Sequence, residues 1–221
     1  MFNYRGLEIE KFCHDSFLVK NGEINLYFDP FKLSKNIPKA DYIFISHEHF
    51  DHFSFDDIHK IIKDSTVLFM NKMTHKEIDS LLDNKMIIIS PGDSIDFNGL
   101  HIEGVPAYNL NKFKEPGKVY HPKEDKQLGF IITFNGVKIY YTGDTDDIPE
   151  MDGLSSKNID LLFIPVSGTY VMTPAEALKA AEKIRADISI PMHYGTIVGD
   201  KKQAEIFKEG CLKKGLHSEI I

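Results

Sequence analysis

Three histidines and an aspartate fall within six consecutive residues, which read His-Glu-His-Phe-Asp-His from position 47. The apolar run Tyr42–Ser46 precedes them and predicts a β-strand. Because residues i and i+2 lie on the same side of an extended chain, His47 and His49 can bind one metal ion together. Asp51 and His52 lie beyond the turn and suit a second ion nearby. No structural need places these residues at a strand end, so the pattern predicts a metal centre.

Two more predicted strands run into residues that bind metals. Val137–Thr142 leads into Gly143 and Asp144, and Ile188–Met192 leads into His193. Taken alone, Asp144 would be an ordinary turn residue and His193 a hydrogen-bonded core histidine. Together with the first cluster, however, both residues are better interpreted as metal ligands, because ligands at the ends of several strands converge at one rim of a sheet structure.

The three motifs together resemble the metallo-β-lactamase superfamily, in particular its branch of Zn-dependent hydrolases that includes ascorbate-6-phosphate lactonase. The resemblance covers essentially the whole chain, from His14-Asp15-Ser16-Phe17 and Asp29-Pro30-Phe31 onward, and the H-x-H-x-D-H motif is highly specific. It implies an α/β (α+β) fold, a four-layered αββα sandwich, formed as a single domain over residues 1–221.

The resemblance also implies a dinuclear site. Its ligands would be His47 and His49 on one metal, Asp51, His52 and His193 on the other, and Asp144 bridging both. Relatives usually carry a further histidine after the strand Ile102–Ala107, where this chain has Tyr108 and Asn109. We expect His121 to fill that position, since imidazole is the better donor; Asn109 and a water-filled position are the alternatives.

Other residues are expected to support this centre. The resemblance places His14 at the wall of the pocket, and we expect Asn109 and Tyr194 to contact the substrate as well. Asp29 should orient a ligand histidine from behind. Asp51, besides binding metal, is the expected catalytic residue, because it can orient the attacking water and accept a proton.

Ligand chemistry predicts the cofactor and the reaction. Histidine and carboxylate without thiolate favour two Zn²⁺ ions, with Mn²⁺ or Fe²⁺ as competitors. A bound ion lowers the pKa of water from 15.7 to about 7, which supplies hydroxide at neutral pH. We therefore expect a metal-dependent hydrolase that cleaves a small ester, lactone or phosphodiester, with the oxyanion stabilised by the second ion.

Charge narrows the choice of partners. The chain has 26 Lys and Arg against 33 Asp and Glu, a net charge of −7, and only two of the basic residues are arginines. This balance argues against a nuclease of the same superfamily, which is the first alternative. The second alternative is an iron-binding redox or sensor module, although di-iron relatives carry a carboxylate where this chain has His49. A homo-oligomer is compatible with the sequence.

Turn and capping signals predict the remaining elements. Asn21-Gly22, Asn98-Gly99 and Asn135-Gly136 mark three hairpins. Ser54, Thr74, Thr173 and Asp200 are expected to begin four helices, of which the one over Thr173–Arg185 is the clearest because Pro174 and Glu176 complete a capping box. A short strand, Leu216–Ile220, should close the chain.

The segment from Tyr108 to Gln127 fits none of these patterns. Its Pro and Gly residues and five lysines predict a long irregular loop, which we interpret as an active-site loop. Five lysines against three acids give the loop a local charge of +2, which is typical of a solvated loop and would also steer a small anionic substrate.

The chain shows no export signal and no apolar run of the ~20 residues that a membrane span needs, so a cytoplasmic protein without a membrane segment is expected. Cys13 and Cys211 match no disulfide or CxxC pattern and should be free thiols.

Overall fold

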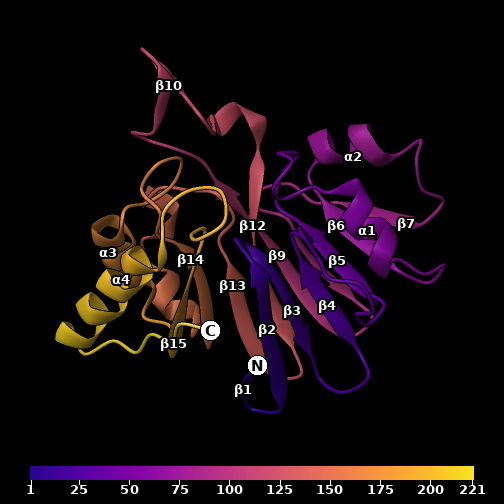
Figure 1. Ribbon diagram of the computed structural model, residues 1–221, viewed down its shortest axis with the longest axis horizontal. Helices are drawn as coiled ribbons and strands as arrows, with labels where there is room; N and C mark the ends of the chain where they lie inside the picture. Colours follow the sequence, from indigo (N-terminus) through magenta and orange to yellow (C-terminus); the bar gives the residue numbers. More distant parts are fainter. The chain divides into compact units, whose positions relative to one another are not determined.

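The computed structural model describes residues 1–221 and divides into two compact units. The first contains residues 1–90 with residue 221, and the second contains residues 91–220. Each unit has its own sheet, with helices against one face of it (Figure 1). None of the four α-helices has the length and apolar character that crossing a membrane requires.

The first unit contains a seven-stranded sheet whose strand order follows the chain. Strands β1 to β4 are antiparallel, and β4 to β7 are parallel to one another. The strands are β1 (Phe2–Tyr4), β2 (Leu7–Cys13), β3 (Ser16–Lys20), β4 (Asn25–Phe28), β5 (Tyr42–Ile45), β6 (Val67–Met70) and β7 (Lys85–Ile88). As predicted, β3 and β4 form the hairpin at Asn21-Gly22, and β5 lies within the run Tyr42–Ser46.

Helices α1 (Phe55–Ile61) and α2 (Lys72–Ile78) pack on one face of this sheet. Ile58 and Ile61 of α1 and Ile78 of α2 join a buried cluster with residues of β3 to β6. The opposite face is also buried and carries stacked aromatic rings, with ring centroids 4.8 Å apart for Phe44 and Phe69. Both faces of the sheet are therefore apolar, which explains why its parallel strands read as continuous hydrophobic runs.

The predicted starts of these two helices had different outcomes. Ser54 is the N-cap of α1 and accepts a hydrogen bond from the Asp57 backbone N–H, as expected. The prediction that Thr74 begins the second helix was wrong, because the Asn71 side chain caps α2 by accepting from the Thr74 N–H. Asn71 directly follows β6, so the chain turns into the helix three residues earlier than the Thr74 signal indicated.

The second unit contains a six-stranded sheet in the order β15-β14-β13-β12-β9-β8. Its strands are β8 (Ser94–Phe97), β9 (Leu100–Ala107), β12 (Gln127–Phe134), β13 (Val137–Tyr141), β14 (Leu161–Pro165) and β15 (Ile188–Met192). The pairs β8–β9 and β12–β13 are the hairpins expected at the two Asn-Gly turns, and β13, β14 and β15 are parallel.

Helices α3 (Pro174–Ile184) and α4 (Lys201–Lys213) cover one face of this sheet (Figure 1). Thr173 caps α3 in a complete capping box with Glu176, and Asp200 caps α4, both as predicted. Gly129 lies where two strands approach closely, since a Cβ at this position would meet the Thr142 carbonyl oxygen at 2.8 Å. The absence of a side chain at Gly129 thus lets β12 pack against the end of β13, the strand that leads to Asp144.

Two predictions for this unit were wrong. Residues 108–127 are not an irregular loop throughout, because they contain a hairpin of β10 (Phe113–Glu115) and β11 (Lys118–Val119) and a 3₁₀ turn (Lys123–Asp125). No strand forms over Leu216–Ile220, where only a single bridge joins Ser218 to Ser189. One bridge is too little pairing for a strand, although it covers the edge of β15.

Candidate metal centre

In the first unit, the candidate ligands follow β5, as the sequence predicts. The ring nitrogens His47 Nε2 and His49 Nδ1 lie 3.0 Å apart. Two imidazoles bound to one ion reach such a separation when each nitrogen is about 2.0–2.1 Å from it, so the pair fits a common metal. The ring of His47 is buried. The chain turns after His49, and the Phe53 N–H stabilises this turn by donating to the His49 carbonyl oxygen at 2.8 Å.

A hydrogen-bonded chain behind these residues sets which nitrogen of each ring carries the proton. The Ser46 hydroxyl donates to Asp29 Oδ2 at 2.6 Å, so it must accept from His47 Nδ1, which lies 2.9 Å away. His52 Nδ1 donates to the same Asp29 oxygen at 2.7 Å. His47 and His52 therefore keep the Nε2 lone pair that a metal needs. Asp29 thus contacts a candidate ligand on the side away from Nε2, and its role in orienting a metal ligand stays a prediction.

Further buried polar groups gather on the Nε2 side of His52. Asp51 Oδ2 lies 4.0 Å from His52 Nε2 and 3.3 Å from His14 Nε2. His14 is fully buried and Asp51 is 8% exposed. The ligand atoms of His14, Asp51 and His52 all lie within 4.8 Å of one another. These side chains can therefore all bind one ion, or some can bind the ion while another contacts a ligand of that ion.

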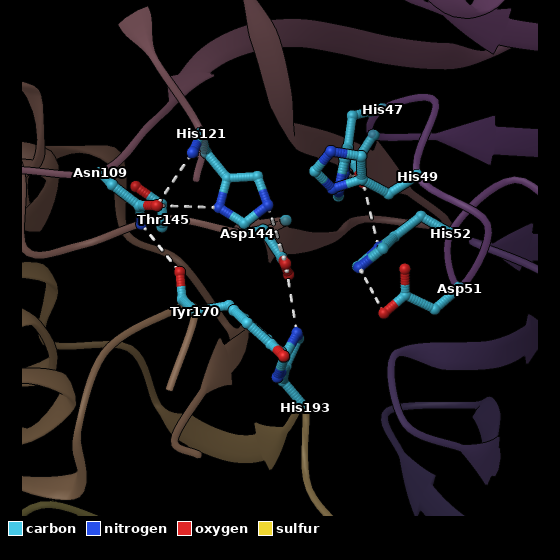
Figure 2. A network of polar contacts seen from close by, with 12 residues as sticks. His47, His49, Asp51, His52, Asn109, His121, Asp144, Thr145, Tyr170 and His193 are labelled. Atoms are coloured by element: carbon cyan, nitrogen blue, oxygen red, sulfur yellow. Dashed lines mark hydrogen bonds and ion pairs between the residues drawn. The ribbon is translucent and has the colours of Figure 1, made fainter. Parts of the chain in front are cut away.

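In the second unit, Asp144 follows β13 and His193 follows β15, and their side chains meet. Asp144 Oδ2 lies 3.1 Å from His193 Nε2 and 3.4 Å from His121 Nε2 (Figure 2). Ser167, two residues beyond the end of β14, lies 2.9 Å from His193 Nδ1. One carboxylate oxygen thus lies close to two imidazole nitrogens, which is the arrangement that a bridging ligand needs.

Asn109 holds His121 in this position (Figure 2). Its Oδ1 accepts the His121 backbone N–H at 3.0 Å and lies 3.0 Å from His121 Nδ1, while its Nδ2 donates to the Tyr170 carbonyl oxygen at 2.9 Å. With the amide oriented in this way, His121 Nδ1 is the donor and Nε2 keeps its lone pair. The Asn109 oxygen is engaged by His121, so this geometry favours the histidine as the ligand of the pair.

A buried ion cluster fixes the segment that carries His121. Lys112 is 8% exposed and pairs with Asp146 Oδ1 at 3.1 Å and with Glu176 Oε2 at 2.9 Å. Asp146 Oδ2 also accepts the backbone N–H groups of Leu110 and Asn111. The cluster thus joins the segment before His121, the loop after Asp144 and the first turn of α3.

The loop lysines carry less free positive charge than the sequence suggested. Lys112 is neutralised in the cluster just described. Lys118 pairs with Glu115 at 2.8 Å, and Lys123 pairs with Glu150 at 2.7 Å. Three of the five lysines therefore have acidic partners, which weakens the argument from the loop for an anionic substrate.

Glu176 is expected to make stability depend on pH. Burial raises its pKa, but hydrogen bonds from Thr173, Lys112 and Asn111 outweigh this and lower the pKa from 4.5 to about 2. A carboxyl group with a lowered pKa stabilises the fold above its unfolded pKa and loses this contribution as the pH falls through its folded pKa. In metal-free protein, Glu176→Gln should therefore be less stable than wild type near about pH 6, and the difference should shrink towards about pH 3. Urea unfolding at the two pH values measures this; a difference that does not change with pH would contradict it.

The remaining predicted pocket residue, Tyr194, lies at the edge of the apolar core of the second unit. It is 9% exposed, and burial raises the pKa of its hydroxyl to about 12. The structure instead brings the Tyr170 ring to His193, with centroids 6.5 Å apart, and to Tyr120.

Sequence reasoning missed the two serines that lie against ligand histidines, Ser46 and Ser167. Ser46 has a positional signal, since it ends the predicted strand Tyr42–Ser46 and directly precedes His47. Ser167 has no such signal, because the histidine that it contacts lies 26 residues away. The donor set as a whole fits divalent metal ions, because buried carboxylates alternate with imidazoles whose Nε2 atoms face them.

Comparisons with known proteins give the family. A family model described as the beta-lactamase superfamily domain matches residues 8–193. A UPF0173 metal-dependent hydrolase of Archaeoglobus fulgidus is 30% identical over 217 residues, with 94% of this chain and 92% of that protein covered. A crystal structure of a candidate metal-dependent hydrolase from Parabacteroides distasonis is 32% identical with a TM-score of 0.83, covering 97% of this chain and 92% of that one.

A metallo hydrolase of Ignicoccus hospitalis has the same fold, with a TM-score of 0.78 at 23% identity and coverage of 97% of this chain and 94% of that chain. The α/β fold class predicted from the sequence is confirmed by these matches. The chain thus belongs to the metallo-β-lactamase superfamily, as its strand-end motifs indicated.

Proposed function

We propose that this chain is a metal-dependent hydrolase that binds two divalent cations. His47, His49 and His121 would hold one ion, Asp51, His52 and His193 the other, and Asp144 would contact both. The relatives at 30% and 32% identity are named for metal-dependent hydrolysis, and in this respect the sequence prediction is confirmed.

One observation carries the proposal further. Nδ1 of His47, His52, His121 and His193 lies within 3.0 Å of a serine, aspartate or asparagine oxygen. A histidine that is fixed through Nδ1 presents Nε2 in one direction, as metal-binding histidines do. Histidines from three separate chain segments would not all be arranged in this way for packing alone.

When bound, divalent cations lower the pKa of a water molecule to about 7 and polarise a carbonyl or phosphoryl oxygen. The residues of the chain supply position and orientation. Asp51 would orient the attacking water, with His14 3.3 Å from its Oδ2 and able to hold it by a hydrogen bond. Asp29, Ser46, Ser167 and Asn109 keep the histidine rings in place during turnover. The bond cleaved would be a small ester, a lactone or a phosphodiester.

The test begins with the purified protein as isolated. We expect about two metal ions per chain, loss of activity with a chelator, and recovery with Zn²⁺, Mn²⁺ or Fe²⁺. The assay compares three substrates: a neutral aryl ester, a lactone that carries an anionic substituent, and an aryl phosphodiester, which is itself anionic. His49→Ala should lose metal and activity, whereas His59→Ala, an exposed histidine of α1, should keep both.

Full activity without metal would disprove the proposal. A coloured, iron-loaded protein that cleaves none of these substrates would instead support the redox or sensor alternative. Steeply salt-dependent RNA binding would support a nuclease.

A further inference from the structure

The turn between β2 and β3 has an unusual composition. It consists of His14 and Asp15, because β2 ends at Cys13 and β3 begins at Ser16. His14 has φ +47°, a left-handed conformation that favours glycine in two-residue hairpins. Turns normally face water, yet both side chains here are fully buried. Turn chemistry alone does not account for a buried histidine and aspartate at these positions, and strained residues of this kind cluster at functional sites.

The Asp15 carboxylate lies on the metal-facing side of His52. Asp15 Oδ2 is 3.5 Å from His52 Nε2, whereas the other nitrogen of that ring is bound to Asp29. The same Asp15 oxygen is 3.8 Å from His14 Nε2. Asp15 therefore approaches the ring on the side that is left for an ion.

The separations between neighbouring donors allow an ion to be shared. Four atoms, from His14, Asp15, Asp51 and His52, are joined by distances of 3.3, 3.5, 3.8 and 4.0 Å. Two ligands that each lie about 2.2 Å from one ion cannot be more than about 4.4 Å apart. The Asp15–His52 pair at 3.5 Å and the Asp51–His52 pair at 4.0 Å both fall below this limit, so an ion bound by His52 Nε2 lies within reach of either carboxylate.

Charge points the same way. Four carboxylates are buried in this unit: Asp57 pairs with Lys60, Asp29 is hydrogen-bonded to His52 and Ser46, and Asp15 and Asp51 lie near His14 and His52. Lys11 supplies one positive charge near Asp15: burial lowers the pKa of Lys11 to about 8, and Asp15 acts against this shift. Asp15 and Asp51 both lie beside His14 and His52, and a divalent cation would offset their two negative charges, since buried charges are costly unless they are paired or bind a metal.

We propose that Asp15 is a further ligand of the ion bound by Asp51 and His52, an inference that rests on the proposed function. A second carboxylate makes the ligands of this ion richer in oxygen, which favours Mn²⁺ or Fe²⁺ with more than four ligands over tetrahedral Zn²⁺. The two ions would then differ in their preferred metal, because the other ion is surrounded mainly by imidazoles.

The experiment titrates Mn²⁺ into the metal-free full chain and compares wild type with Asp15→Asn. The control is Asp41→Asn, a partly buried carboxylate of the same unit that pairs with Lys63. Loss of a direct ligand should weaken one Mn²⁺ site by more than about 100-fold, beyond the 10–100-fold that is typical of groups behind a ligand. The other site and the control should not change. In the Co²⁺-loaded protein, Asp15→Asn should also alter the visible d–d absorption of one ion.

Thermal unfolding separates a ligand from a structural residue. Without metal, Asp15→Asn should be as stable as wild type or more stable, because a buried negative charge is removed. The increase in Tm on adding Mn²⁺ should be smaller in the variant. Unchanged Mn²⁺ affinity and an unchanged Co²⁺ spectrum would overturn the role of Asp15 while leaving the proposed function intact. A wild type that binds no metal would instead overturn the proposed function.

Discussion

Replacing Asp144 by Ala is expected to lower kcat/KM for the cleaved substrate by about 10³-fold or more. Asp144 Oδ2 lies 3.1 Å from His193 Nε2 and 3.4 Å from His121 Nε2, so one oxygen serves two imidazoles of the candidate centre. Its loss removes the ligand proposed to contact both ions. Metal analysis by mass spectrometry should show the same variant with fewer than two ions per chain.

Two further variants make the Asp144 prediction specific. Asp144→Asn keeps the shape of the side chain but loses its charge, and it should be almost as impaired as Asp144→Ala. Asp147→Ala removes a carboxylate from the same loop that pairs with Lys183, and it should retain activity and metal. If Asp144→Ala keeps two ions and near-normal activity, Asp144 is not a ligand.

The second large effect is expected for Asp29→Ala, which should weaken metal binding by about 10–100-fold. Asp29 accepts hydrogen bonds from His52 Nδ1, the Ser46 hydroxyl and the Ser46 backbone N–H, at 2.7, 2.6 and 2.8 Å. Its removal leaves these buried donors without their acceptor, at a cost of about 1–3 kcal/mol for each such group. His52 would also lose the contact that directs Nε2. Isothermal titration with Zn²⁺ measures the affinity, and urea unfolding measures the stability.

Asp29→Asn distinguishes orientation from simple loss of stability. The amide keeps one oxygen acceptor. Residue 29 has a left-handed backbone conformation, φ +39°, which asparagine tolerates. We expect this variant to recover part of the stability but less of the metal affinity, because the uncharged amide has one acceptor oxygen in place of two. Either the Ser46 backbone N–H or the two side-chain donors, His52 Nδ1 and the Ser46 hydroxyl, then lose their acceptor. Equal affinity in wild type and both variants would show that Asp29 does not orient a ligand.

Much of the fold could be predicted because its signals are local. Asn98-Gly99 and Asn135-Gly136 specify tight turns, and the Thr173 capping box specifies a helix start, through contacts within a few residues. The failures occurred where distant contacts compete with such signals. Asn71 rather than Thr74 caps α2, because the end of β6 places Asn71 first. Likewise the segment after Asn109 forms the β10–β11 hairpin around the turn signal Pro116-Gly117, but its short, lysine-rich flanks do not have the pattern of strands.

The candidate ligands themselves could be named from the order of amino acids, because imidazole and carboxylate groups at strand ends carry their chemistry wherever the strands go. Their orientation depends on folding. Asp29 and Ser167 lie 23 and 26 residues from the histidines that they contact, and Asn109 lies 12 residues from His121. The buried position of Asp15 is likewise invisible in a turn sequence that reads as exposed. Such contacts join segments that only the sheets bring together, and no local pattern encodes distances of 3 to 4 Å across them.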